Sequence, residues 1–266
     1  MSTLAHALPT PRLVSADILK LGKRRGLAAV VALMTIGTVV IANTVIELMH
    51  LSDSVKHGPA GGVTMLGHLA WTISALGAAA AAIVGSTAGS GDLDAGVYRD
   101  LAVTGRSRLA LFVSRIPAGL TYLLPFVAAA YAIEAGVSVA FTGWHPAPST
   151  YLLVVTGLWT LVSVTFYYLL ALGISSLVGS RSYTIGIVLA WRLALTPLLA
   201  SIAALGVVRE LVPGVALDKL LPAALHAAAR QGPRVGMSLA AAAVVLVAWA
   251  VAAVVAGAVR DTTRDA

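Results

Sequence analysis

Residues 27–46 read LAAVVALMTIGTVVIANTVI, without one charged side chain. An α-helix of about 20 residues covers the roughly 30 Å of hydrocarbon in a bilayer. Only helices satisfy their own backbone N–H and C=O groups in lipid, whereas an open sheet or an irregular loop leaves them unpaired. The run therefore predicts a membrane-spanning helix. A signal-peptide core is shorter, about 7–15 residues, so we expect this run to remain in the protein as its first span.

Five more apolar runs follow, and the composition of the whole chain is also that of a membrane protein. The 266 residues are 59% hydrophobic and 11% charged, with a mean hydropathy of +0.91, whereas a soluble domain carries roughly 25% charged residues. The sequence thus predicts an all-α polytopic membrane protein with a single transmembrane domain over residues 1–266. Pro117 and Pro125 fall inside the long third span and predict a kink or a tilt there. The predicted spans are 27–46, 65–87, 111–141, 151–178, 183–206 and 236–259.

Lys and Arg are unequally shared between the two sides of this arrangement. Twelve of them fall on the side of the N-terminal segment, five fall on the other side, and Arg192 lies within a span. Basic residues favour the cytoplasmic side, so we expect both termini in the cytoplasm. A sequence rich in Ala and Arg but poor in Lys suggests a GC-rich bacterial genome. We therefore expect the protein in the bacterial plasma membrane. The net charge is +7, but the Lys and Arg residues flank apolar runs rather than forming one patch. We therefore expect no nucleic-acid partner.

The N-terminal segment, residues 1–26, contains an amphipathic stretch at 12–25. Leu13, Ala16, Leu19 and, less regularly, Ile18 and Leu21 gather on one side of a helix. The opposite side carries Lys20, Lys23 and Arg24. This pattern is typical of a helix that lies at the inner membrane interface, with its cations near anionic lipid. The alternative is that these charges only set the topology of the first span.

The long connection at 207–235 is also amphipathic. Pro213 and Pro222 each suit the first turn of a short helix, where a missing N–H costs nothing. Two interpretations remain open. Either two short helices lie on, or dip into, the outer leaflet, or the segment is an ordinary extracellular loop.

The connection between the second and third spans, residues 88–110, holds the one conspicuous polar segment, at 92–108. Asp92 or Asp94 suits the start of a helix, and Gly105 suits the left-handed position just past its end. Leu93, Val97 and Leu101 recur at helical spacing and form an apolar stripe. The segment predicts a short helix parallel to the membrane that contacts a soluble partner. A solvated loop that carries a topology signal is the alternative.

The text GVYRDLAVTGRSRL at residues 96–109 resembles the cytoplasmic segment between spans 2 and 3 of ABC-2-type transporter permeases. The opening 17–25, DILKLGKRR, is similar to that family's interfacial start, with Asp17 where Glu is usual. The resemblance implies an ABC exporter permease whose 92–108 segment is a coupling helix seated in an ATP-binding subunit. It implies contact at these positions: Asp94, Val97, Tyr98, Arg99, Asp100, Leu101, Thr104, Arg106 and Arg108.

The chain carries no phosphate-binding G-x-x-x-x-G-K-[ST] sequence, so it has no ATPase site of the P-loop type. The resemblance therefore implies a separate ABC ATP-binding subunit that holds ATP and Mg, with no cofactor in this chain. It also implies a second permease copy, as a homodimer or heterodimer, within the membrane lipid.

Three polar side chains inside the predicted spans mark a candidate translocation path: Glu134, Tyr168 and Arg192. Ionisable groups in a span are expensive and are usually functional or paired. Counted from the inner ends of their spans, Glu134 and Arg192 differ in height by roughly 12 Å at about 1.5 Å per residue. Three interpretations remain open. The residues line a substrate path, Glu134 and Arg192 form a structural ion pair, or Glu134 sits at the outer interface.

An enzyme is the weaker interpretation. There is no Cys, and the sequence Gly-Ile-Ser-Ser at 173–176 resembles a serine motif only superficially, because no base is placed to serve Ser175. The metalloprotease text H-E-x-x-H is absent as well. We therefore expect no catalytic residue and no metal ligand. The alternatives to an ABC permease are a secondary transporter and a non-catalytic membrane scaffold subunit.

Overall fold

The computed structural model describes residues 10–94, 96, 107–228 and 236–263, and over these residues it is helical without a strand. Six helices are long and apolar enough to cross a membrane. This confirms the predicted all-α architecture with six apolar spans. Their bounds are Arg25–Ser52, Val63–Gly91, Arg108–Ala140, Thr150–Val178, Arg181–Ser201 and Leu239–Thr263.

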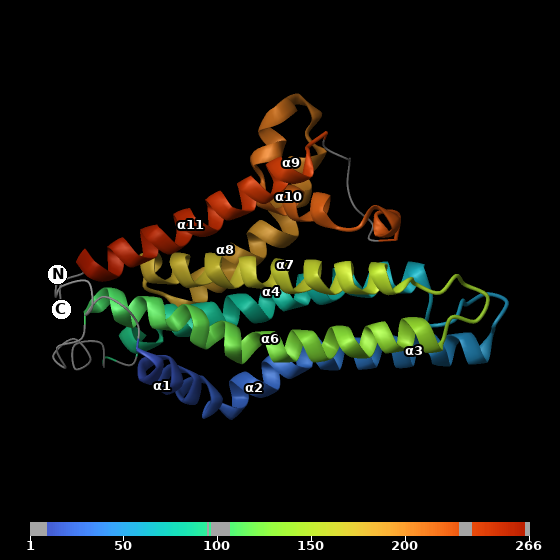
Figure 1. Cartoon of the computed structure of the whole chain (residues 1–266), viewed down its shortest axis with the longest axis horizontal. Helices are drawn as coiled ribbons and strands as arrows, with labels where there is room; N and C mark the ends of the chain where they lie inside the picture. Colours follow the sequence, from blue (N-terminus) through green and yellow to red (C-terminus); the bar gives the residue numbers. More distant parts are fainter. Residues whose placement is uncertain (1–9, 95, 97–106, 229–235, 264–266) are drawn as a thin grey trace.

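Figure 1 shows α4, α6 and α7 side by side along the longest axis of the molecule, with α1 and the end of α11 at the end where α6 begins. The elements in chain order are α1 (Pro11–Gly22), α2 (Arg25–Ala32), the π-helical turn η1 (Leu33–Gly37), α3 (Thr38–Ser52), α4 (Val63–Asp94), α6 (Arg108–Ala140), α7 (Thr150–Val178), α8 (Arg181–Ala190), the π-helical turn η2 (Trp191–Leu195), α9 (Thr196–Ser201), the 3-10 helix η3 (Ala203–Leu211), α10 (Pro213–Leu220), the 3-10 turn η4 (Ala223–Leu225) and α11 (Leu239–Thr263).

Local signals explain several helix ends. The Ser149 hydroxyl accepts the amide of Leu152 at the start of α7, a usual N-cap. Gly179 follows α7 with φ +69°, the left-handed conformation that glycine adopts without strain. Other ends differ from the prediction. Helix α4 continues to Asp94 rather than ending at residue 87, so Asp92 lies inside a helix and the predicted cap there is wrong.

The fifth span is not a uniform helix. It widens into the π-helical turn η2 in its middle, and Pro197 follows as the second residue of α9. Proline has no amide to donate, so it disturbs the hydrogen-bond ladder of the turn before it. The carbonyl oxygen of Trp191 accepts both the backbone amide of Thr196 and the Thr196 hydroxyl, the latter at 2.9 Å. Such π-helical turns are often found at functional sites, and η2 contains Arg192.

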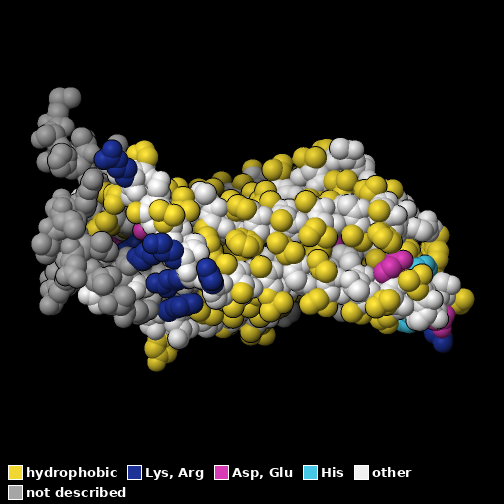
Figure 2. All heavy atoms as spheres, turned by 90° about the horizontal axis from the view of Figure 1, so that it is seen from below, with side chains coloured by type: hydrophobic (Ala, Val, Ile, Leu, Met, Phe, Trp, Pro, Cys, Tyr) yellow, Lys and Arg dark blue, Asp and Glu magenta, His cyan; other side chains and the backbone are white. Residues whose placement is uncertain are grey.

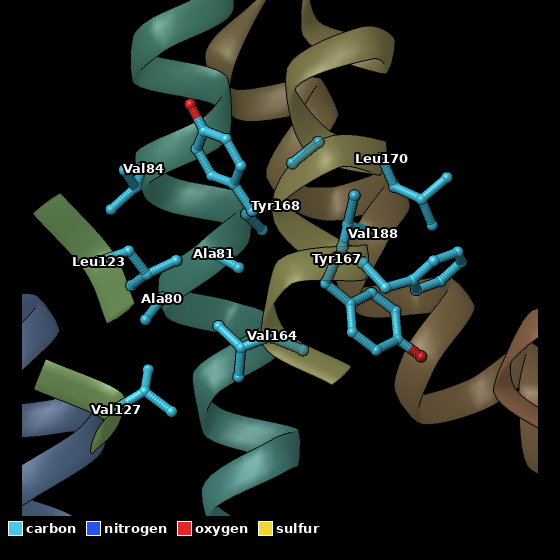
Figure 3. Close-up of a cluster of buried hydrophobic side chains, with 14 of the residues drawn as sticks. Ala80, Ala81, Val84, Leu123, Val127, Val164, Tyr167, Tyr168, Leu170 and Val188 are labelled. Atoms are coloured by element: carbon cyan, nitrogen blue, oxygen red, sulfur yellow. The ribbon is translucent and has the colours of Figure 1, made fainter. Parts of the chain in front are cut away.

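The core of the bundle is the pairing of α4 with α7. A Cβ added to Gly77 would lie 2.7 Å from Val164, and one added to Gly89 would lie 2.8 Å from Ser175, so only glycine allows this close approach. Ser74 and Ser163 share a hydrogen bond of 2.6 Å across the pair. Small residues and interhelical hydroxyl bonds are the usual means of packing helices in lipid. These glycines of the second span therefore serve contacts within the chain. Figure 3 shows buried side chains of both helices, among them Ala81 of α4 and Val164 of α7.

The six spans differ sharply in burial. In the most apolar stretch of α4, 78% of the residues are buried inside the structure, against 11% in α11. Helix α4 is thus the central helix, which explains its content of Ala, Gly and Ser. Helix α11 instead presents an apolar outer face, including Val244, Val247, Val251 and Val255. In a membrane protein, such a face contacts lipid or another membrane subunit.

The chain after the fifth span folds back onto the bundle. The indole Nε1 of Trp159 in α7 donates to the carbonyl oxygen of Leu217 in α10 at 2.8 Å. Leu221 and Leu225 pack with Leu66 of α4 in a hydrophobic cluster of buried residues. Helix α10 begins at Pro213, whereas Pro222 precedes only the three-residue turn η4. Helix α10 and the turn η4 are therefore packed against α4 and α7, whereas Val207, Val208 and Leu211 in η3 are exposed.

Candidate functional site

Most of the predicted coupling segment lies outside the described residues. This applies to the stripe at Val97 and Leu101 and to Gly105, and Asp94 is described only as the last residue of α4. Arg108 is the first residue of α6, after Ser107, whose hydroxyl accepts the amide of Ala110. The other predicted contact residues outside the described part are Tyr98, Arg99, Asp100, Thr104 and Arg106.

Two turns into α6, a buried ion pair joins three spans at this end of the bundle. Arg115 is 4% exposed, and its Nη1 lies 3.0 Å from the Oδ2 of Asp261 in α11, which is 1% exposed. The same nitrogen donates to the carbonyl oxygen of Gly89 in α4 at 3.2 Å. A charge buried this deeply persists only when it is paired and hydrogen-bonded. The pair therefore fastens α4, α6 and α11 together next to the connection between α4 and α6.

Helix α1 is attached to the same place. The hydroxyl of Ser114 in α6 donates to the Oδ2 of Asp17 at 2.7 Å. Lys20 and Arg24 lie near Arg115 around a small cavity of about 20 Å³ between α1, α4 and α6. Figure 2 shows Lys and Arg side chains gathered at this end and an apolar belt along the middle of the molecule.

The apolar residues of α1 differ in burial. Leu21 is 5% exposed and packs in the core, whereas Leu19 is 63% exposed. The side of α1 that meets α6 carries Asp17 and Leu21, and the interfacial position of the exposed apolar residues stays a prediction.

Tyr168, which the sequence places in a candidate path, is fully buried in α7. Its hydroxyl donates to the carbonyl oxygen of Arg115 at 2.6 Å. A Cβ at Gly119 would lie 2.0 Å from the tyrosine oxygen, so glycine at that position makes room for the ring. The tyrosine thereby connects α7 to the turn of α6 that carries the ion pair.

Glu134 is fully buried between α3 and α6. Its two carboxylate oxygens accept hydrogen bonds from the amide Nδ2 of Asn43 at 2.9 Å and the hydroxyl of Ser138 at 2.7 Å. Buried carboxylates require such donors. Glu134 thus has neutral partners on the first and third spans, and its depth relative to the outer membrane interface stays a prediction.

Arg192 has a different set of partners, at the packed connection. Its guanidinium lies 5.5 Å from the ring centre of Trp71 and 5.9 Å from that of Tyr167, a cation–π arrangement. Its Nη1 is 3.8 Å from the Oδ1 of Asp218 in α10. Burial raises the pKa of the Asp218 carboxyl, and the nearby charges of Arg192 and His226 oppose that rise.

The structure therefore separates the three predicted path residues into three settings. The ion pair between Glu134 and Arg192, one of the open alternatives, is not formed; each side chain has other partners. Reasoning from sequence did not find Asp218 or Asp261 as partners. Asp218 offered one signal, since it is an acidic residue in the amphipathic part of the connection that follows the span with Arg192.

Comparison with known proteins adds no family to these observations. No protein-family model matches the chain, and no curated protein is significantly similar to it. Among the residues that the structure describes, no three His, Asp or Glu side chains are grouped as a metal site requires. Geometry and the sequence resemblance remain the basis for a functional proposal.

Proposed function

We propose that this chain is the membrane-spanning permease subunit of an ATP-driven ABC exporter, energised by a separate ATP-binding subunit. The observation that carries the proposal is the buried ion pair of Arg115 and Asp261 at the end of the bundle where α4 leaves and α6 begins. The 88–110 connection, whose sequence resembles a coupling helix, is adjacent to four helices that contact one another: α1, α4, α6 and α11.

The mechanical argument follows from the rigidity of α6. Arg108 begins the helix and Arg115 lies two turns along it, so a displacement of the connection reaches the ion pair without an intervening loop. From there it passes to α11 through Asp261, to α4 through Gly89 and to α1 through the hydrogen bond between Ser114 and Asp17. Rigid-body motion of packed helices is a common way to open one side of a transporter.

Three finer elements of the proposal rest on the distribution of charge and apolar surface. The basic end of the bundle, with α1 attached, supports cytoplasmic termini in a bacterial plasma membrane and a position of α1 at the inner lipid interface. The apolar outer face of α11 supports a second permease copy beside lipid. ATP and Mg belong to the partner subunit.

For the translocation path, the buried guanidinium of Arg192 is the best supported of the three residues. It is 5% exposed, in a π-helical turn, and its nearest acidic group is too far for a hydrogen bond. Glu134 and Tyr168 have closer hydrogen-bond partners within the bundle, and their place on a path stays a prediction.

The test is co-purification of the tagged chain with its candidate ATP-binding subunit in detergent. The critical variant reverses two charges of the connection, Arg99→Asp with Asp100→Arg. A matched control reverses an exposed pair at the other end of the molecule, Asp53→Lys with Lys56→Asp, whose charges lie 2.9 Å apart.

We expect a stable complex that the Arg99 and Asp100 reversal breaks and the control reversal leaves intact. A complex that survives both reversals with full transport would show that the coupling surface lies elsewhere. No complex with any ATP-binding subunit would favour a secondary transporter or a membrane scaffold.

A further inference from the structure

Two carboxylates on neighbouring faces of α3 and α6 form no ion pair. Glu134 in α6 is fully buried, and Glu47 in α3 is half-buried. Among the residues that the structure describes, neither carboxylate lies within 4.0 Å of a Lys, Arg or His nitrogen, unlike the acidic groups of the three ion pairs. Acidic residues inside a span are usually paired or functional, so this excess of acceptor oxygens needs an explanation.

Asn43 in α3 contacts one of these carboxylates and has one amide atom unused. Its Nδ2 donates to the carbonyl oxygen of Val39 at 3.1 Å and to the Oε2 of Glu134 at 2.9 Å. Both hydrogens of this nitrogen are therefore used, and the reversed amide would place its oxygen against two acceptors. The Oδ1 of Asn43 is thus fixed as an acceptor. Asn43 is 6% exposed, and this oxygen is buried without a hydrogen-bond partner, which is unusual for a buried polar atom.

A cavity of about 300 Å³ lies against these groups, between α3, α6 and the chain that follows α3. Asn43 and Glu47 both line it, because residues four apart lie on the same face of a helix. The Oε2 of Glu47 accepts the backbone amide of Ala60 at 3.2 Å, which orients the carboxylate and leaves its other oxygen for a second donor. The remaining lining residues are Thr44, Leu48, Val137 and Phe141.

The cavity lies at the end of the spans and opens to the surface. Ala60 belongs to the connection between α3 and α4, and Phe141 is the residue directly after α6. Leu48 is 60% exposed and Phe141 is 45% exposed, so a solute reaches the cavity beside these side chains. Figure 2 shows acidic and His side chains at the end of the molecule opposite the gathered Lys and Arg side chains, next to the apolar belt.

The polar lining accepts hydrogen bonds and carries negative charge. A cleft lined by one sign of charge within apolar walls concentrates the opposite ion. An ammonium group has three N–H donors and no acceptor, so it matches the free oxygen of Glu47 and the Oδ1 of Asn43. A metal ion fits less well, since the described residues contain no group of three His, Asp or Glu side chains that could hold one.

The apolar lining and the volume define the rest of the ligand. Leu48, Val137 and Phe141 offer no polar side-chain atom, so the ammonium group must carry an apolar body. An apolar cavity of roughly 150 Å³ holds one benzene molecule. A cavity of about 300 Å³ therefore accommodates a single ring with a short aminoalkyl chain.

We propose that the cavity between α3 and α6 binds a small amphipathic primary amine from solution, with its ammonium group between Glu47 and Asn43 and its apolar body against Leu48, Val137 and Phe141. The site goes beyond the proposed function, since binding needs neither the ATP-binding subunit nor ATP.

The test is titration calorimetry on the full chain in nanodiscs of phosphatidylcholine, without nucleotide; empty nanodiscs give the heat of partitioning into lipid. The probe is 2-phenylethylamine, compared with the uncharged 2-phenylethanol and the anionic 3-phenylpropanoate. We expect the amine to bind at least about tenfold more tightly than the alcohol, the discrimination expected for hydrogen bonds to a charged group. The acid should bind least.

Two variants and one control assign the binding. Glu47→Gln removes the charge but keeps an oxygen for the amide of Ala60, so it should remove most of the preference for the amine over the alcohol. Val137→Phe should weaken both probes, because the larger side chain fills the cavity. Asp53→Asn is the control: it neutralises an exposed carboxylate just after α3 that does not line the cavity, and it should leave both affinities unchanged.

Equal affinity of the wild-type protein for the amine and the alcohol would overturn the ammonium assignment without recourse to any variant. A preference for the amine that Asp53→Asn removes and Glu47→Gln does not would place the recognition group elsewhere. No heat above that of empty nanodiscs at millimolar probe would overturn the site itself.

A lipid headgroup is the other source of a primary ammonium group. Binding of 2-phenylethylamine should persist in nanodiscs that contain phosphatidylethanolamine. Its loss there would make the lipid the occupant and contradict a small solute. All of these outcomes are independent of the co-purification result, so the failure of one proposal is distinguishable from the failure of the other.

Discussion

Replacing Asp261 by leucine removes one partner of the buried ion pair and keeps the branched, four-atom shape of the side chain. Arg115 would then hold its charge at 4% exposure against the carbonyl oxygen of Gly89 and its remaining contacts. Breaking a buried pair in this way costs about 3–5 kcal/mol of folding free energy, because the remaining charge is left uncompensated. For a chain of this size each kcal/mol lowers the midpoint of thermal unfolding by roughly 2–4 °C. We therefore expect a loss of roughly 10 °C.

The assay is thermal unfolding of the detergent-solubilised protein, followed by loss of the monodisperse peak. The double variant Arg115→Met with Asp261→Leu should recover most of the loss, since apolar residues replace a buried pair at little cost. The exposed pair is the comparison: Asp53→Ala should cost less than about 1 kcal/mol, because Lys56 is 77% exposed. If Asp261→Leu is as mild as Asp53→Ala, or if the double variant is worse than either single one, the ion pair does not hold the helices together.

Two further predictions concern the other polar contacts of the spans. Gly119→Ala should destabilise the protein by about 1–3 kcal/mol, because its Cβ would lie 2.0 Å from the Tyr168 oxygen. Adding Tyr168→Phe should restore part of the loss in the same melting assay. The absence of any rescue would contradict the packing argument. Glu134→Ala should lower the free energy of unfolding by about 3 kcal/mol, since the amide of Asn43 and the hydroxyl of Ser138 lose their acceptor. Glu134→Gln should lower it by only about 1 kcal/mol. Equal losses in the same melts would show that the hydrogen bonds contribute little.

The six spans were predictable because their signal is local. A helix in lipid satisfies its own backbone, so about 20 apolar residues identify it without any knowledge of its neighbours. The end of α7 is a good example: the left-handed Gly179 stops the helix at Val178, where the prediction had placed it. The end of α4 is the opposite case. The helix continues to Asp94 because hydropathy falls before helical backbone hydrogen bonding ends.

The partners of the buried charges were not predictable in the same way. The difference in height between Glu134 and Arg192 argued against their pairing, but it could not name Asn43 or Asp218 as the actual partners. Those contacts depend on how α3 meets α6 and on how α10 folds back. A short helix such as α10 has no strong sequence signal for its position, since its packing against α7 depends on one indole hydrogen bond and on shape.

The sequence by itself determined the class of this protein: helical, with six apolar spans and basic charge concentrated toward one side. These properties follow from chain composition and from the energetics of backbone groups in lipid. Only the tertiary structure decided which helix is central, which polar residues meet, and where a cavity lies. Arg115 with Asp261 and Arg192 with Asp218 are joined across long stretches of chain. The geometry of packed helices, which no local pattern encodes, brings these residues together.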